Sequence, residues 1–446
     1  MKAKKIFIWM TRVWLFLLPL QTHLLLQSAR LAGHEWPFGE ISLYALDVGF
    51  FLLVISAFTA RRYWKKLPLS YIFGLIIFIC LLAVSVFLHH DAKNTWVLFL
   101  RYLEGLALVA LLAVVPDRTR KLGIAFVAGI TAAAAFGIWQ FMTQYVPKSS
   151  LFGVAEQNPS VAGVSVLLSS AGRFLRAYGT FSHPNIFGGY LAAALLMLLI
   201  IVLQRPASER RNSVSVKEFL GRYAWTLVVL LLFGAFTFSF SRSAWIAFAV
   251  SLVVLASITV QRNRSYELRV WVLAGIVPIV FLVLHSSVLV PLVSERIVAR
   301  NVVERVSIEN RRQSLVEGYT IFKKYWAEGL GLGRSTYYIA EHSPESLQWW
   351  EIQPPHNIFL LLADEASIFT ALTFIGVLVF LGRDSLHAVR QQKQNAFPMS
   401  ALGLTFVALI VVIGLFDHYL LTLPAGFFLT FTLLGFSVRT AAAEAS

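Results

Sequence analysis

Long apolar blocks alternate with short polar segments along most of the chain. About 20 consecutive apolar residues form a helix that crosses the hydrocarbon core of a membrane, and the blocks have this length. The pattern predicts an all-α membrane protein, a polytopic bundle of about 12 transmembrane helices that uses residues 1–446 as a single domain. The predicted helices lie at residues 7–27, 41–60, 69–89, 95–115, 122–143, 184–203, 223–240, 242–260, 270–292, 357–381, 398–416 and 419–438.

The composition agrees with a membrane protein. Hydrophobic residues make up 58% of the chain and charged residues 14%, whereas about 25% of the residues of a typical soluble domain are charged. This balance excludes an ordinary soluble enzyme. The formal net charge of +15 would suggest nucleic acid as a partner of a soluble protein. Here the basic residues lie at the ends of predicted helices, so we expect membrane lipids around the protein and no nucleic acid.

Lysine and arginine gather in alternate loops, as in the cytoplasmic loops of other membrane proteins. The short outer loops 28–40 and 90–94 contain only Arg30 and Lys93 of these two types, whereas segments such as 61–66 are rich in both. We therefore expect both termini in the cytoplasm.

Two segments on the outer side, residues 144–183 and 293–356, are much longer than the other loops. Long loops on a rigid scaffold often hold binding and catalytic residues. We therefore expect the functional site on the outer face.

The longer of these loops contains a predicted amphipathic helix. Its apolar residues are spaced four, three and four positions apart, at Leu315, Tyr319, Phe322 and Trp326. Such a helix either lies on the membrane surface or covers one end of the bundle. Glycines at positions 329, 331 and 333 are expected to end it in a tight turn.

Four short polar groups lie where outer loops meet predicted helices. They are Arg176–Asn185, Ser239–Ser243, Pro354–Asn357 and Asp417–Tyr419. They are far apart in the sequence, yet the topology places all four on one membrane face. Because the topology was inferred from basic residues in other loops, this convergence is an independent indication of a site.

Two arginines in these groups are candidate anion ligands. Arg242 lies in the tight junction of two predicted helices, and Arg176 precedes a turn that contains glycine and proline. A charge at the membrane boundary is costly and often functional. The alternatives are that Arg242 extends to lipid headgroups and that Arg176 is a solvated loop residue. Two guanidinium groups facing one site suit a diphosphate, because each offers phosphate oxygens two parallel donors.

Histidines and an aspartate complete the candidate set. His356 follows two prolines at the start of a predicted helix, where it is either a base that takes a proton from a hydroxyl or a capping residue. His183 and Asn185 read mainly as helix-start residues. Asp417 and His418 are candidates for orienting a base, for binding sugar hydroxyls or for a structural hydrogen bond.

The sequence predicts no metal and no cofactor, because these histidines include no i, i+4 ligand pair and have no cysteine partner. Arg101 and Glu104 are three residues apart in one predicted helix and most simply form an ion pair. Asp364 and Glu365, below His356 in another, either support the site or pair with Arg101.

At these positions the chain resembles the O-antigen ligase and polymerase-like membrane glycosyltransferases. The resemblance covers roughly residues 95–438. It rests on an ordered set of motifs, which are Arg176–Asn185 with Gly188-Gly189-Tyr190-Leu191, Ser239–Trp245, Arg311–Gly333, Pro355-His356-Asn357 with Phe359-Leu360, and Asp417-His418-Tyr419.

The resemblance implies a twelve-helix bundle with a large periplasmic loop that contains amphipathic helices, located in the bacterial inner membrane. It implies a metal-independent, inverting glycosyltransferase that moves a glycan from an undecaprenyl diphosphate carrier to an acceptor hydroxyl. His356 would be the base, and Arg176 and Arg242 would hold the diphosphate. The residues expected to bind substrate are His183, Asn185, Arg311, Asn357, Asp417 and His418.

The chain departs from the family pattern after the histidine. It has Glu365-Ala366-Ser367, where the family commonly has glycine within two residues of the glutamate. In the long loop, either Arg311 or Arg312 corresponds to the family's arginine, and the sequence does not decide between them.

The acceptor also stays open. A ligase transfers the glycan to lipid A core, a polymerase to another carrier-linked glycan, and a protein O-oligosaccharyltransferase to serine or threonine. The rival from another class is a polysaccharide transporter or flippase. Transporters typically have repeat symmetry and broken helices near the midplane, whereas the unusual polar residues here lie at the outer boundary. A third hypothesis, a structural scaffold, does not explain why histidines and arginines cluster in these motifs.

Overall fold

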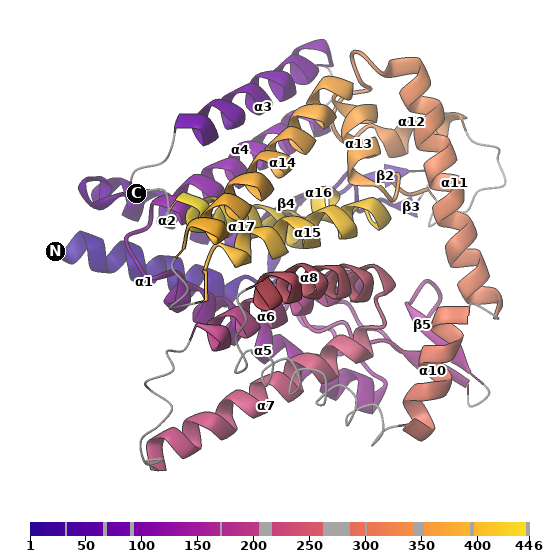
Figure 1. The fold of residues 1–446 in the computed structure, drawn as a ribbon. Coiled ribbons are helices and arrows are strands. Elements are labelled where there is room, and N and C mark those ends of the chain that lie inside the picture. The colour runs from indigo at the N-terminus through magenta and orange to yellow at the C-terminus, as the bar shows by residue number, and fades with distance from the viewer. Residues whose placement is uncertain are drawn as a thin grey trace.

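The computed structural model describes residues 1–31, 34–65, 69–89, 93–169, 172–204, 216–261, 286–298, 301–342, 352–392 and 397–442. Long helices dominate these residues (Figure 1). The helices of the first half are α1 (Lys2–Leu17), α2 (Ala45–Thr59), the short 3-10 helix η1 (Arg61–Tyr63), α3 (Leu69–Leu88), α4 (Lys93–Val114), α5 (Thr119–Thr143) and α6 (Pro184–Leu203). Those of the second half are α7 (Val216–Ser239), α8 (Arg242–Gln261), α10 (Ser286–Val298), α11 (Val302–Tyr325), α12 (Ser335–His342), α13 (Ile358–Glu365), α14 (Ile368–Gln391), α15 (Ala401–Phe416), α16 (Tyr419–Thr422) and α17 (Pro424–Ala442).

Six of the described helices, α4, α5, α6, α8, α14 and α17, are long and apolar enough to cross a membrane. Four further apolar stretches, in α2, α3, α7 and α15, are shorter. These helices confirm the prediction of a multi-pass membrane protein that is mainly helical. The count of twelve stays a prediction, because most of the helix predicted at 270–292 lies outside the described residues.

Helices α6 and α17 form the centre of the bundle. Within their spans 89% and 94% of the residues are buried, against at most half in the other four candidate spans. A helix that is apolar on all sides suits the centre of a bundle, because other helices pack against every side of it. Glycines allow neighbouring helices to approach one another closely. A Cβ at Gly188 of α6 would lie 2.7 Å from Ser241, and one at Gly105 of α4 would lie 2.6 Å from Phe431.

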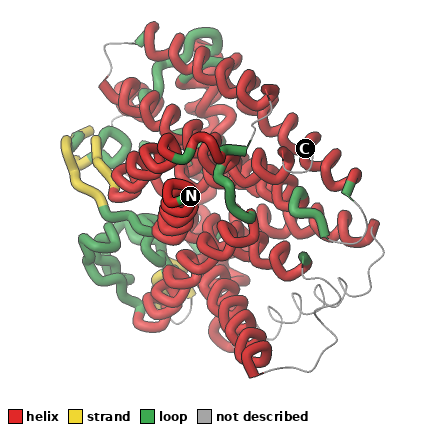
Figure 2. The backbone as a smooth tube through the Cα atoms, turned by 90° about the vertical axis from the view of Figure 1, so that its left-hand side faces the viewer, coloured by secondary structure: helices red, strands yellow, loops and turns green. Residues whose placement is uncertain are grey.

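Three short antiparallel hairpins also occur, which the sequence analysis did not predict. They pair β1 (His23–Gln27) with β4 (Ile41–Tyr44), β2 (Arg30–Leu31) with β3 (His34–Glu35), and β5 (Val166–Ser169) with β6 (Gly172–Leu175). Figure 2 shows the strands (yellow) at the margin of the helical bundle, beside loops (green).

Several predicted helix boundaries are wrong. The helix predicted at 41–60 begins at Ala45, because residues 41–44 form β4. The helix predicted at 7–27 ends at Leu17, because Pro19 lacks an N–H and the following apolar residues pair in β1 instead. The helix predicted at 357–381 is divided into α13 and α14 at Ser367, whose φ is 123°. The helix predicted at 419–438 is divided into α16 and α17, because Leu423 is extended before Pro424.

The two chain ends and the long loops lie at opposite ends of the bundle. Figure 1 shows the marks for both termini at one end, and α11, α12 and the strands β2, β3 and β5 toward the other. The side of the membrane on which each end of the bundle lies stays a prediction.

The amphipathic helix predicted in the long loop is confirmed as part of α11. Gly318 and Ile321 of α11 are buried, and a Cβ at Gly318 would lie 2.7 Å from Pro355. Tyr319 and Trp326 of the predicted apolar stripe are exposed. Helix α11 therefore packs against the end of the bundle through Gly318 and Ile321, as the second alternative predicted, and it leaves Tyr319 and Trp326 uncovered.

The glycine turn after α11 is held by Glu365. The φ angles of Gly329, Gly331 and Gly333 are all positive, as expected for a tight turn. The Gly333 N–H and the Ser335 hydroxyl donate to the Glu365 carboxylate at 2.8 and 2.7 Å. Glu365 therefore ties the end of α13 to the loop that carries α11.

The predicted ion pair within α4 is confirmed. Arg101 donates to Glu104 at 2.8 Å and also binds Asp47 of α2. The suggestion that Asp364 or Glu365 pairs with Arg101 is wrong, because Asp47 occupies that guanidinium and Glu365 binds the glycine turn. Both carboxylate oxygens of Asp364 are buried without a hydrogen-bond partner among the described residues.

The break at Ser367 leads to a stability prediction. A non-glycine residue at this φ is strained by about 1–3 kcal/mol, and this is the region where the family commonly has glycine. We expect Ser367→Gly to raise the free energy of unfolding by about 1 kcal/mol, even though it removes the helix cap in which the Ser367 hydroxyl accepts from the Thr370 N–H.

The thermal unfolding midpoint of the detergent-purified variant measures this effect. Ser367→Ala is the matched control, because it loses the same cap without relieving the strain, and its midpoint should fall. A glycine variant no more stable than the alanine variant would contradict the assignment of strain.

Candidate active site

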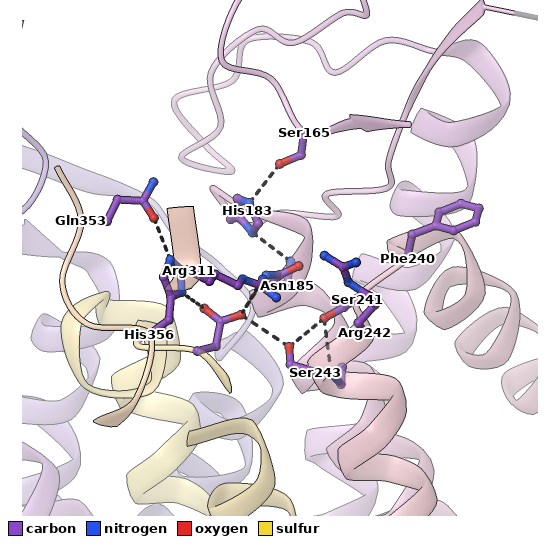
Figure 3. A network of polar contacts seen from close by, with 12 residues as sticks. Ser165, His183, Asn185, Phe240, Ser241, Arg242, Ser243, Arg311, Gln353 and His356 are labelled. Carbon is purple, nitrogen blue, oxygen red and sulfur yellow. Dashed lines mark hydrogen bonds and ion pairs between the residues drawn. The ribbon is translucent and has the colours of Figure 1, made fainter. Parts of the chain in front are cut away.

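A buried carboxylate, Asp417, lies at the centre of the polar groups on the outer side. It occupies the turn between α15 and α16, and its side chain is 5% exposed. One oxygen accepts hydrogen bonds from Asn185 Nδ2 at 2.8 Å and from the Ser243 hydroxyl at 3.4 Å. Arg311 Nη2 is 3.8 Å from the same oxygen, and His356 Nδ1 is 3.6 Å from the other. Figure 3 shows Asn185, Ser243, Arg311 and His356 gathered at this point.

These neighbours keep Asp417 ionised. Burial by itself raises the pKa of a carboxyl group, but the interaction with His356 and the charge of Arg311 outweigh it. The net pKa of Asp417 is therefore well below its usual value, and the group carries a full negative charge at neutral pH.

His356 is held between two fixed segments. Its Nε2 is 3.0 Å from Gln353 Oε1, and its Nδ1 faces Asp417. Pro354 and Pro355 precede it, and the side chain of Asn357 caps α13 by accepting from the N–H groups of residues 359 and 360. The imidazole is 12% exposed, so it has a defined orientation and keeps some access.

His418 packs beside His356. The two ring centroids are 4.7 Å apart. Thr422 Oγ1 is 2.7 Å from His418 Nδ1, and the Phe38 ring meets the His418 ring edge-on at 5.6 Å. Burial, followed by the neighbouring charge of His356, lowers the pKa of His418 to about 3. His418 is consequently neutral at physiological pH.

Arg176 is buried and is used inside the protein. Its Nε donates to the Ser239 carbonyl at 2.8 Å, and its Nη2 donates to Asn185 Oδ1 at 2.7 Å. This second bond orients the Asn185 amide so that its Nδ2 meets Asp417. The geometry therefore places Arg176 one residue away from Asp417.

His183 caps α6. Its Nδ1 accepts from the Asn185 N–H at 3.1 Å, and its Nε2 is 2.9 Å from the Ser165 hydroxyl. Burial, followed by the charge of Arg176, lowers the pKa of His183 to about 3. His183 and Asn357 thus have structural roles at helix starts, and substrate contacts for either of them stay a prediction.

Arg242 begins α8 directly after a tight turn in which Phe240 has a φ of 46°. Its Nη1 is 3.3 Å from both the Arg296 carbonyl and a Glu304 oxygen. Its Nη2 is buried and has no hydrogen-bond partner among the described residues. An unpaired buried donor is unfavourable, so a ligand oxygen at this position would be stabilised.

The sequence analysis missed Arg296 and Glu304. Arg296 of α10 donates to Glu304 of α11 at 2.5 Å and to the Phe240 carbonyl at 3.0 Å. Asn301 caps α11 by accepting from the Glu304 N–H. The spacing of Asn301 and Glu304 is typical of a helix start and was the available signal for Glu304. Arg296 follows Ser294 and Glu295 in a segment of mixed polarity that contains no motif.

The neighbouring arginines Arg311 and Arg312 differ clearly in position. Arg311 faces Asp417. Arg312 is 65% exposed and pairs at the surface with Glu309 at 2.5 Å. Of the two arginines that the sequence could not separate, only Arg311 contacts the site.

Among the residues that the structure describes, the site has an excess of positive charge. Four arginines surround two carboxylates, and the set consists of Arg176, Arg242, Arg296 and Arg311 with Glu304 and Asp417. Burial lowers the pKa of Arg176, and the charge of Arg296 lowers it further. Because the arginines outnumber the carboxylates beside them, the cluster is favourable for binding an anion.

The chain was next compared with known protein families. Residues 227–375 match the O-antigen ligase family. The matched segment is about a third of the chain and confirms the resemblance drawn from the sequence. No curated protein and no solved structure matches the chain.

The O-antigen ligase segment runs from α7 into α14 and contains Arg242, Arg311 and His356. Arg176 and Asp417 lie on either side of it in the sequence. The fold thus brings residues from outside the matched O-antigen ligase segment into contact with residues inside it.

Three groups of this site could also hold a metal ion. Ligand atoms of His356, Asp417 and His418 lie within 4.8 Å of one another. These residues come from two distant segments, so no metal-binding spacing is visible in the sequence.

Proposed function

We propose that this protein is an O-antigen ligase-type glycosyltransferase. It transfers a glycan from an undecaprenyl diphosphate carrier to a hydroxyl group of lipid A core. The reaction takes place at the periplasmic face of the bacterial inner membrane, and both termini lie in the cytoplasm. The observation that carries this proposal is the meeting of His356, Asp417 and an arginine cluster at the end of the bundle opposite the termini.

In this proposal His356 is the base. Asp417 orients the imidazole and stabilises its positive charge once it is protonated. The acceptor hydroxyl takes the position now held by Gln353 at His356 Nε2. His356 removes the proton as the acceptor oxygen forms a bond to the anomeric carbon of the donor. The bond from that carbon to the diphosphate breaks, and inversion follows because the attack comes from the opposite side.

The arginines stabilise the leaving group. The departing diphosphate takes the bonding electrons and gains charge in the transition state, so fixed cations favour the transition state over the bound donor. Arg242, with its unpaired Nη2, and Arg311 are the proposed diphosphate ligands. Arg176 acts mainly through Asn185. Because the arginines supply the positive charge, the scheme needs no metal and no cofactor.

A polymerase or a protein O-oligosaccharyltransferase would use the same chemistry with another acceptor. The direct test is a transfer assay with purified protein, a chelator and an undecaprenyl diphosphate-linked glycan, offering lipid A core, carrier-linked glycan and peptide separately. Product on lipid A core supports the ligase. Product on carrier-linked glycan or on peptide would replace the ligase assignment with a polymerase or a protein O-oligosaccharyltransferase. Activity that requires added metal would contradict the metal-free scheme.

His356→Gln should lower transfer by at least about 100-fold, the usual range for loss of a general base. His342→Gln is the matched control. His342 is an exposed histidine at the end of α12, so its replacement should leave transfer unchanged. Equal activity of both variants in the same assay would remove His356 from the mechanism.

The adjacent arginines provide a second matched pair. Arg311→Ala should lower kcat/KM by about 100-fold, which corresponds to about 2.7 kcal/mol of transition-state stabilisation. Arg312→Ala removes only a surface ion pair, which contributes little, and should stay within about twofold of wild type. Initial rates at varied donor concentration give kcat/KM for both variants. Similar losses of kcat/KM in Arg311→Ala and Arg312→Ala would contradict the role of Arg311.

A further inference from the structure

A cavity of about 240 Å³ lies next to the site, on the side of the β1–β4 hairpin. Its walls come from the hairpin, the start of α4 and the turn between α16 and α17. The lining residues that bear on its chemistry are Phe38, Glu40, Ser42, Tyr44, Asn94 and Thr422.

One layer of side chains separates this cavity from the proposed base. Phe38 and Thr422 line the cavity, and both contact His418. The other neighbour of the His418 ring is His356. A ligand in the cavity would therefore lie just across His418 from His356.

The charge of the cavity differs from that of the arginine cluster. Arg101 is the one lysine or arginine among the described residues that line it. Its guanidinium is already bound to Asp47, Glu104 and the Ser42 carbonyl. The cavity thus offers no free cation for a phosphate.

The chemistry of the lining suits a sugar. Phe38 and Tyr44 provide apolar ring surfaces, and the hydroxyl, amide and carboxylate groups of the other residues can bind sugar hydroxyls. The volume is below the roughly 300–1,000 Å³ of typical drug-sized pockets, which limits the ligand to about one sugar ring.

We propose that this cavity binds the terminal sugar of the acceptor glycan. The proposal rests on the proposed function, because it assigns the cavity to the acceptor and the arginine cluster to the donor. The bound sugar would then lie on the hairpin side of His356, across the His418 ring, while the diphosphate stays on the side of Arg242 and Arg311. The hairpin and the other cavity walls lie outside the segment that matches the O-antigen ligase family.

Ser42→Trp tests the proposal by filling the cavity. Leu43→Trp is the matched control, because adjacent residues of a strand face opposite sides and Leu43 is exposed and does not line the cavity. With lipid A core as acceptor, Ser42→Trp should raise the acceptor KM at least about tenfold and leave the donor KM unchanged. Leu43→Trp should change neither. An unchanged acceptor KM, or an equal rise in the donor KM, would overturn the proposal.

Glu40→Gln is a milder variant in case tryptophan disturbs the fold. It removes the charge of a sugar-binding carboxylate and retains its shape, so it should weaken acceptor binding about three- to tenfold. Binding of lipid A core oligosaccharide to the purified protein, measured by titration without donor, gives a readout that does not need catalysis. Suppose that the oligosaccharide binds to wild type but not to Ser42→Trp, and that wild type shows no transfer. The cavity proposal is then supported, and the proposed function fails. If wild type does not bind, or all variants bind equally, the cavity proposal fails whatever the activity.

Discussion

The buried negative charge of Asp417 is the constraint on which the outer end of the bundle depends. Removing an ionised carboxylate from water costs several kcal/mol unless other groups replace the lost hydration. Here the replacement comes from α6 through Asn185, from α8 through Ser243, from α11 through Arg311 and from the segment before α13 through His356. Each contact also fixes the element that provides it. Residues separated by more than two hundred positions in the sequence are thereby held in one site.

The charges around this centre are unevenly distributed. Arg242, Arg296 and Glu304 form a cationic cluster on one side. On the other side the cavity at the β1–β4 hairpin combines apolar walls with polar groups and has no free cation among its described residues. A glycosyl transfer between a diphosphate donor and a neutral acceptor needs both kinds of surface, on either side of a base. The proposed reaction accounts for this asymmetry, which a transporter pathway or a scaffold would not require.

The sequence predicted the helical membrane fold and the polar groups of the site, because membrane helices and loop charges have strong local patterns. The helix breaks at Ser367 and Leu423 were missed because each lies inside a block that is mostly apolar, although Asp364-Glu365 and Pro424 interrupt those blocks, and the β1–β4 hairpin was missed because its leucines extend an apolar run. In the site, His356 and Arg242 stand out beside helix starts. The pairing of Arg242 with Glu304 and of His356 with Asp417 depends on tertiary contacts, which no local pattern records. The same limit applied to Arg311 and Arg312, which only packing distinguishes.

The most direct test of the account is the steady-state kinetics of Asp417→Asn with donor and acceptor varied separately. The amide retains the shape of the side chain and much of its hydrogen bonding, but it lacks the charge that orients His356 and stabilises its protonated form. The account predicts a loss in kcat of at least about 100-fold, with a folded protein and a donor KM that does not rise. A folded variant whose kcat stays close to that of wild type would show that the buried carboxylate does not support the base, and the proposed mechanism would be wrong.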